Sequence, residues 1–193
     1  MRSISTAVSV TAGTVAVGLF VASPWIAGAE VSRENGRPLS WASEIRDDAT
    51  YAVETTQDAT GDTHVGIRLS GLAPRTEYTV HAHEAPCGED GFDSGPHYQD
   101  VITFHSHPAF AERNEIRIPL RSDRRGRAQG STTVQWQFPP GRTARSLLLH
   151  HRRPVQPPNA PRFWITEATV LACLDVDLAD SGRVRPVGPG ADQ

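Results

Sequence analysis

The chain has 193 residues, with 19 basic and 22 acidic side chains and a formal net charge of −3. Proteins that bind nucleic acid usually present a basic surface to the phosphates, so this balance argues against a nucleic-acid partner. Beyond a short N-terminal segment, the length suits one ordinary domain that buries a sizeable core.

Residues 1–29 have the pattern of an export signal. A basic start at Arg2 is followed by a largely apolar stretch, residues 7–26, and by a small-residue cleavage motif, Ala-Gly-Ala. We therefore expect a mature chain that begins at Glu30 and a secreted, periplasmic or cell-envelope protein, with no membrane contact beyond the signal segment. The alternative is an uncleaved membrane anchor, because the apolar stretch is nearly long enough to span a bilayer.

Short runs of alternating apolar and polar residues follow one another along the rest of the chain, separated by turns rich in glycine and proline. The expected strands are residues 50–55, 64–69, 77–83, 115–120, 130–138, 145–150 and 168–176, with a further short strand around Trp41. No stretch keeps a helical period. The sequence therefore predicts an all-β domain over residues 50–178, an antiparallel sandwich or barrel. Residues 30–49 are an N-terminal segment, and residues 179–193 are expected to be a disordered tail.

The mature chain contains two cysteines, Cys87 and Cys173. In an exported protein the oxidising surroundings make a disulfide the default outcome for such a pair. Thiolate metal ligands are the alternative, but a thiolate site needs more cysteines or a tighter cluster.

The chemistry of the chain depends on four histidines. His81 and His83 are two residues apart on an expected strand, so their side chains point to the same face. His97 follows in a long loop, and His150 ends an apolar strand. Imidazole suits copper and zinc, and four nitrogen ligands in a near-planar array favour copper. Each has a plainer interpretation: a chance His-x-His, a solvated loop histidine, or a satisfied core histidine.

The order of several short motifs resembles the copper/zinc superoxide dismutase family. Gly71-Leu72-Ala73-Pro74 leads into His81-Ala82-His83, then Cys87 and Gly95-Pro96-His97; Arg145 to His150 and Leu171-Ala172-Cys173 close the series. The family has a Gly-Leu-x-Pro turn before a His-x-His strand, a disulfide cysteine, Gly-Pro-His, an Arg-x-Leu-Val-Val-His segment and Leu-Ala-Cys in this order. The matches extend from Gly71 to Cys173, a little over half of the chain.

The resemblance implies a fold, a ligand set and a substrate. The fold would be a Greek-key antiparallel barrel of eight strands with one disulfide, Cys87–Cys173. The copper ligands would be His81, His83, His97 and His150. The activity would be a superoxide dismutase reaction, in which copper alternates between two oxidation states and converts superoxide to oxygen and hydrogen peroxide.

Two departures from the family pattern affect these expectations. His105 lies eight residues after His97, the spacing of the family's first zinc-only ligand, but His107 comes too soon and the following His-x-Gly-Asp segment is missing. We therefore expect copper as the cofactor, with a zinc site as the alternative. Val170 occupies the position of the family's anion-steering arginine, and the candidates to replace that arginine are Arg152, Arg153 and Arg162 of the neighbouring loop.

Three functions therefore compete. The first is an exported copper-dependent superoxide dismutase. The second is a dismutase-like copper-binding protein that buffers or delivers the metal without efficient turnover. The third is a structural or adhesion sandwich with incidental histidines.

Overall fold

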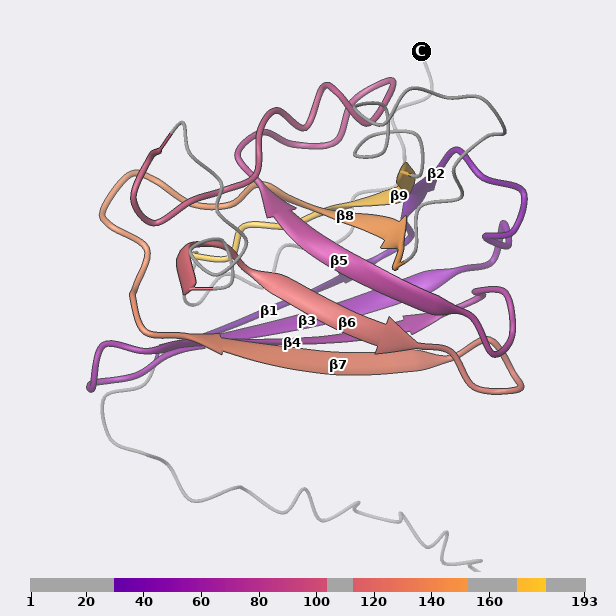
Figure 1. Ribbon diagram of the computed structural model, residues 1–193, viewed down its shortest axis with the longest axis horizontal. Coiled ribbons are helices and arrows are strands. Elements are labelled where there is room, and N and C mark those ends of the chain that lie inside the picture. The colour runs from indigo at the N-terminus through magenta and orange to yellow at the C-terminus, as the bar shows by residue number, and fades with distance from the viewer. Residues whose placement is uncertain (1–29, 104–112, 153–169, 180–193) are drawn as a thin grey trace, which may run out of the picture.

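The computed structural model describes residues 30–103, 113–152 and 170–179 (Figure 1). The strands in these ranges are β1 (Glu30–Gly36), β2 (Leu39–Ser40), β3 (Thr50–Gln57), β4 (Thr63–Ser70), β5 (Glu77–His83), β6 (Arg117–Arg121), β7 (Ala128–Val134), β8 (Ser146–His151) and β9 (Val170–Asp175). The all-β prediction is confirmed. Within the same ranges, no helix is both long enough and apolar enough to cross a membrane.

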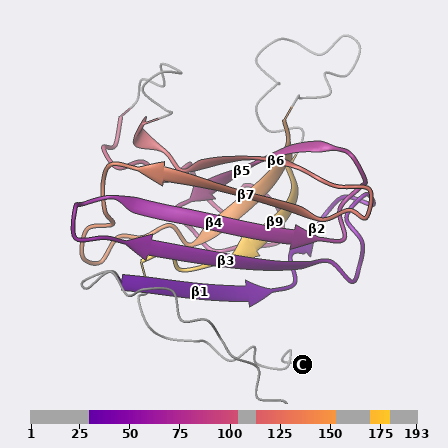
Figure 2. The same cartoon turned by 90° about the horizontal axis from the view of Figure 1, so that it is seen from below.

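The strands form two antiparallel sheets that lie in two layers. One sheet has the order β1-β3-β4-β7 and the other the order β2-β9-β8-β5-β6. Figure 2 shows the four-stranded sheet in front, with the strands of the second sheet crossing behind it. The described strands therefore make a sandwich, and no closed barrel is seen among them.

The two layers come close along β6 and β7 without sharing a ladder. A Cβ placed on Gly130 of β7 would lie 2.8 Å from the carbonyl oxygen of Pro119 on β6. Glycine therefore permits this approach. Pro119 has no amide hydrogen to donate to a neighbouring strand, which agrees with its place on an edge strand.

The core fills the space between the layers and follows from the alternation along each strand. Every second residue of β3 and β4 is buried, and the polar residues between them face outward. Buried side chains contributed by the two inner faces include Val53, Val65, Ile67, Val80, Ala82, Leu147, Leu149 and Leu174.

The N-terminal segment 30–49 belongs to the sandwich. β1 pairs with β3 along its whole length, and β2 pairs with Cys173 and Ala172 of β9. Strands β1 and β2 thus lie in the same two sheets as the strands of residues 50–178. The expected export signal and residues 180–193 of the expected tail lie outside the described residues.

Candidate metal centre

The alternation of β5 places two imidazoles on the outer face of the five-stranded sheet. Ala82 points into the core and is 1% exposed, so His81 and His83 on either side of it point away from the core. His83 is nevertheless 7% exposed, because a loop covers this part of the sheet.

That loop carries His97 back to the end of β5. The backbone of His97 forms an isolated antiparallel bridge with His83. On either side of the bridge, the Glu84 amide donates to the Pro96 carbonyl at 3.1 Å and the Tyr98 amide to the Ala82 carbonyl at 2.8 Å. His97, sixteen residues after His81 in the chain, thus becomes its neighbour in space.

The predicted disulfide between Cys87 and Cys173 is confirmed and holds the loop against the sheet. It joins the loop after β5 to strand β9. Cys173 and its ladder partner Leu148 are both 0% exposed, although neither belongs to the core between the layers. The loop therefore encloses a second buried region on the outer face, next to the histidines.

His150 arrives from β8, and a register shift helps to place it. The pairing of β8 with β9 changes register between Leu149 and His150, and His150 then pairs with Val170. Irregularities of this kind re-aim a side chain without ending a sheet. On the other side, His150 pairs with Thr79 of β5 and Leu148 pairs with His81, so the imidazoles of His81 and His150 share one face.

The four imidazoles converge. The ring centroid of His81 lies 4.7 Å from that of His97 and 5.0 Å from that of His150. The ring centroid of His83 lies 4.8 Å from that of His97 and 6.4 Å from that of His150. Residues separated by almost seventy positions in the sequence therefore meet in one cluster.

Hydrogen bonds determine which ring nitrogens remain available as ligands. Nδ1 of His83 donates to the carbonyl of Gly95 at 2.8 Å, and Nδ1 of His97 donates to Oε2 of Glu115 at 2.9 Å. In each ring this leaves Nε2 with a lone pair. Nε2 of His81 lies 3.2 Å from Oγ1 of Thr79, and in the tautomer that donates this bond Nδ1 is unprotonated. That Nδ1 lies 3.2 Å from Nε2 of His97.

Two ring nitrogens of the cluster, one on His83 and one on His150, are buried. Among the residues that the structure describes, Nε2 of His83 and Nε2 of His150 have no hydrogen-bonding partner. A buried polar atom usually has one, and leaving it unsatisfied costs about 1–3 kcal/mol. A cation bound between the rings would provide the missing partner for both.

Burial keeps the imidazoles of His81, His83 and His150 neutral, which is the form that binds a metal. Burial is the largest cause lowering the pKa of His81 to about 2, and the imidazoles of His97 and His150 lower it further. Burial also lowers the pKa of His83 to about 4 and that of His150 to about 4. These rings resist protonation in mildly acidic solution.

Glu115 is a functional candidate that the sequence analysis missed. Its side chain is 4% exposed. Oε2 accepts from His97 and from Nε and Nη2 of Arg117 at 2.9 and 2.6 Å, and Oε1 accepts from Gln99 at 3.0 Å. Burial alone would raise the pKa of Glu115, but these hydrogen bonds outweigh it and lower the pKa to about 2. The carboxylate is therefore ionised and fixes the orientation of His97.

The donor set fits copper better than a hard cation. Four imidazoles offer nitrogen ligands only, while magnesium and calcium select oxygen. In the described ranges no group of three or more histidine, cysteine and carboxylate side chains is already arranged as a metal site. The case for a metal therefore depends on the convergence of the four rings, on the lowered pKa values of His81, His83 and His150, and on the unpartnered nitrogens of His83 and His150.

The sequence departs from the family pattern in two ways: Val170 replaces a steering arginine, and the zinc-ligand segment is incomplete. Val170 pairs with His150 across the β8–β9 ladder, and a Cβ on Gly91 would lie 3.2 Å from its methyl groups. Arg152 is exposed, and its Nη1 lies 4.0 Å from a carboxylate oxygen of Glu77. Arg153, Arg162, His105 and His107 lie outside the described residues, so their expected roles remain predictions.

No protein-family model and no curated protein matches the chain.

Proposed function

We propose that this protein is an exported copper-dependent superoxide dismutase. The observation that carries the proposal is the convergence of His81, His83, His97 and His150, with two buried Nε2 atoms that lack a partner within the described ranges. A core histidine is normally satisfied by the protein around it, whereas a ligand histidine keeps one nitrogen free. The order of motifs resembling the dismutase family supplies the reaction.

In this proposal the ligands are Nδ1 of His81 and Nε2 of His83, His97 and His150. The second nitrogen of three of these rings is oriented by Thr79, Gly95 and Glu115. Such partners set the tautomer and raise the basicity of the ligating nitrogen. When bound, copper would supply an alternation between two oxidation states, oxidising one superoxide to oxygen and reducing the next, with two protons, to hydrogen peroxide.

Glu115 supports the proposal of copper without zinc. In the copper/zinc superoxide dismutase family, which the chain resembles, the histidine at the position of His97 uses its second nitrogen to bind zinc. Here that nitrogen donates to Glu115, whose carboxylate is also held by Arg117 and Gln99. The carboxylate thus performs the orienting role that a second metal would otherwise have. A zinc site built with His105 is the alternative.

The finer features of the fold and the location are part of the same proposal. We include in the proposal a Greek-key barrel of eight core strands, formed from the two sheets described above, with β1 as an added edge strand. Export through the signal at residues 1–29 agrees with the disulfide, because such bonds persist in oxidising compartments.

A second function, copper buffering or delivery, is favoured by Val170. The residue that pairs with His150 offers no positive charge to a superoxide anion. A site of this kind could hold copper tightly and still react slowly with an anion.

Copper titration and superoxide decay, measured on the same sample, test the proposal. We expect one copper ion for each chain and a decay rate well above that of a His81→Ala variant. His64→Ala is the matched control, because His64 is an exposed histidine on the other sheet. Absence of stoichiometric copper would reject both copper functions. Copper binding with decay no faster than in His81→Ala would leave only buffering or delivery.

A further inference from the structure

The outer face of the four-stranded sheet carries two adjoining hollows that the proposed copper function does not use. One has a volume of about 470 Å³ and the other about 650 Å³. Both are lined by Ala52, Arg68 and Gln129, so they form one trough across the sheet. The four histidines of the metal centre belong to the other layer and to its covering loop.

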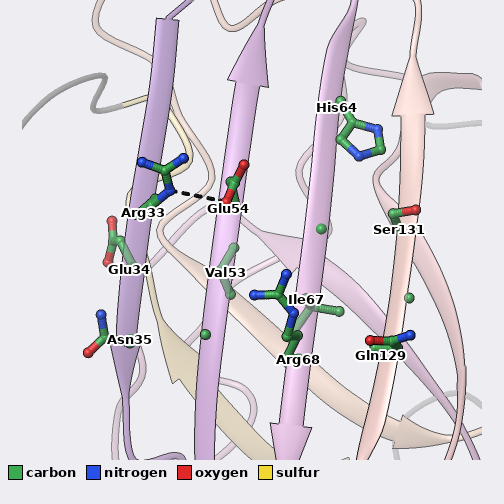
Figure 3. Close-up of a pocket in the computed structure, with 13 residues that line it drawn as sticks. Arg33, Glu34, Asn35, Val53, Glu54, His64, Ile67, Arg68, Gln129 and Ser131 are labelled. Atoms are coloured by element: carbon green, nitrogen blue, oxygen red, sulfur yellow. Dashed lines mark hydrogen bonds and ion pairs between the residues drawn. The ribbon is translucent and has the colours of Figure 1, made fainter. Parts of the chain in front are cut away.

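Small residues form the floor of this trough. Gly66 of β4 pairs with Glu54 on one side and with Ser131 on the other, and Ala52 lies one row further along. Figure 3 shows the polar side chains of β1, β3, β4 and β7 around this floor. Larger side chains would pack well at the centre of an exposed sheet face. The small residues here leave a depression instead.

Glycine at position 66 is not required by the fold. A Cβ added there would meet nothing closer than the carbonyl oxygen of Glu54 at 3.9 Å, which is an ordinary contact, and φ is outside the left-handed region. Glycine in a strand interior costs stability, and it often marks a place where another molecule approaches the backbone. The space above Gly66 is thus a cradle that any side chain would fill.

The edges of the trough carry charged side chains of both signs beside other polar groups, and its carboxylates are Glu34, Glu54 and Asp123. Arg68, Arg121 and Arg127 line one end. Among the described residues, Arg68 and Arg121 have no ion pair, whereas Arg127 is paired with Asp123 at 3.0 Å. At the other end Arg33 is paired with Glu54 at 3.1 Å (Figure 3).

The other polar side chains of the trough offer both donors and acceptors of hydrogen bonds. They come from Asn35, His64, Gln129 and Ser131. Sugar hydroxyls also donate and accept hydrogen bonds, so these side chains suit a sugar. The arginines without an ion pair suit acid groups. The carboxylates of Glu34, Glu54 and Asp123 would repel a dense polyphosphate. The trough therefore fits a chain of sugars with spaced acid groups.

We propose that this trough binds a linear acidic polysaccharide, with a sugar unit over Gly66 and Ala52 and its acid groups at Arg68 and Arg121. Residues on the far layer from the metal centre carry the interaction, so it is independent of copper. Binding would hold an exported protein close to an acidic cell-surface or extracellular polymer.

The test uses a linear oligogalacturonate as the probe, with a neutral dextran of equal length beside it. Gly66→Val fills the cradle without changing charge, and its control is Thr56→Val, on the same face one row away. Arg68→Gln removes the unpaired charge, and its control is Arg37→Gln, an exposed arginine beyond β1. Affinity is measured by calorimetry, and melting curves show that each variant is folded.

We expect the oligogalacturonate to bind and the dextran not to bind. Gly66→Val and Arg68→Gln should each weaken binding by about tenfold or more, while both controls should bind like the unaltered protein. Three results would overturn the proposal: no binding by the unaltered protein, equal binding by folded Gly66→Val, or equal loss in the controls. Tighter binding to anionic lipid vesicles or to duplex DNA would overturn the assignment to a polysaccharide.

Discussion

Nδ1 of His97 lies 2.9 Å from Oε2 of Glu115, and the same carboxylate also accepts hydrogen bonds from Arg117 and Gln99. The contact determines which nitrogen of His97 is left to face His81. It also brings a full negative charge to the far side of the ring, which raises the basicity of that nitrogen. Glu115 is thus a positioning residue for the proposed copper ligand.

Replacing Glu115 with glutamine should weaken copper binding by roughly ten- to a hundredfold. Glutamine keeps the size of the side chain but loses the charge that pairs with Arg117 and His97. Competition with a chelator of known affinity measures the effect, and the spectrum of the bound Cu(II) reports the changed ligand field. Glu54→Gln, on the outer face of the other sheet, is the control. Equal affinities for Glu115→Gln and this control would remove Glu115 from the site.

Much of the fold could be predicted because alternation along a strand reflects burial on one face. Strands β3, β4 and β5 fall close to the expected ranges for this reason. Strand β1 was not predicted, because Glu-Val-Ser-Arg-Glu-Asn-Gly is largely polar and pairs on one edge only. The alternation of apolar and polar residues also cannot predict whether the two sheets close into a barrel, because closure depends on whether β6 and β7 share hydrogen bonds.

The metal centre was only partly predictable from the residues themselves. The two-residue spacing of His81 and His83 placed both on one face, but nothing in that spacing brings His150 to them. That expectation came from the family resemblance. Glu115 was missed, although the sequence held a signal: Glu115 and Arg117 are two charged residues on one face of an expected strand whose other face is apolar.

Introducing the missing positive charge should increase the proposed activity. Val170 pairs with His150, so a Val170→Arg side chain would start beside the site. We expect the kcat/KM for superoxide to rise by about tenfold or more, with a steeper dependence on ionic strength. Val31→Arg adds the same charge on β1 of the other sheet and is the control. Both variants should first be shown to bind copper equally. A similar kcat/KM for superoxide in Val170→Arg and Val31→Arg would then exclude local steering of the anion.

Breaking the disulfide should destabilise the protein strongly. Cys87 and Cys173 are 86 positions apart, so the bond closes a long loop and restricts the unfolded chain by about 4 to 5 kcal/mol in the loop-entropy model. For a domain of this size, Cys87→Ser should lower the Tm by roughly 10 to 15 °C. Differential scanning calorimetry of both proteins measures this change in Tm. A reductant should reproduce the loss in the unaltered protein and have no further effect on Cys87→Ser. A variant with an unchanged Tm would show that the loop is held by other contacts.

Tyr51 connects the two layers and should make stability depend on alkaline pH. Its hydroxyl on β3 donates to the carbonyl of Asp175 on β9 at 2.7 Å, and burial, with the nearby carboxylates of Glu34 and Asp175, raises its pKa to about 12. An unfolded tyrosine ionises near pH 10, so the unfolded chain loses this proton first. The contribution is therefore complete below pH 10 and is lost as the pH rises toward 12. In Tyr51→Phe the free energy of unfolding should be lower by about 1 kcal/mol at neutral pH, and this gap should narrow from pH 10 upward. Urea unfolding of both proteins across this range measures it, and a gap that stays constant would show that the hydroxyl does not titrate with folding.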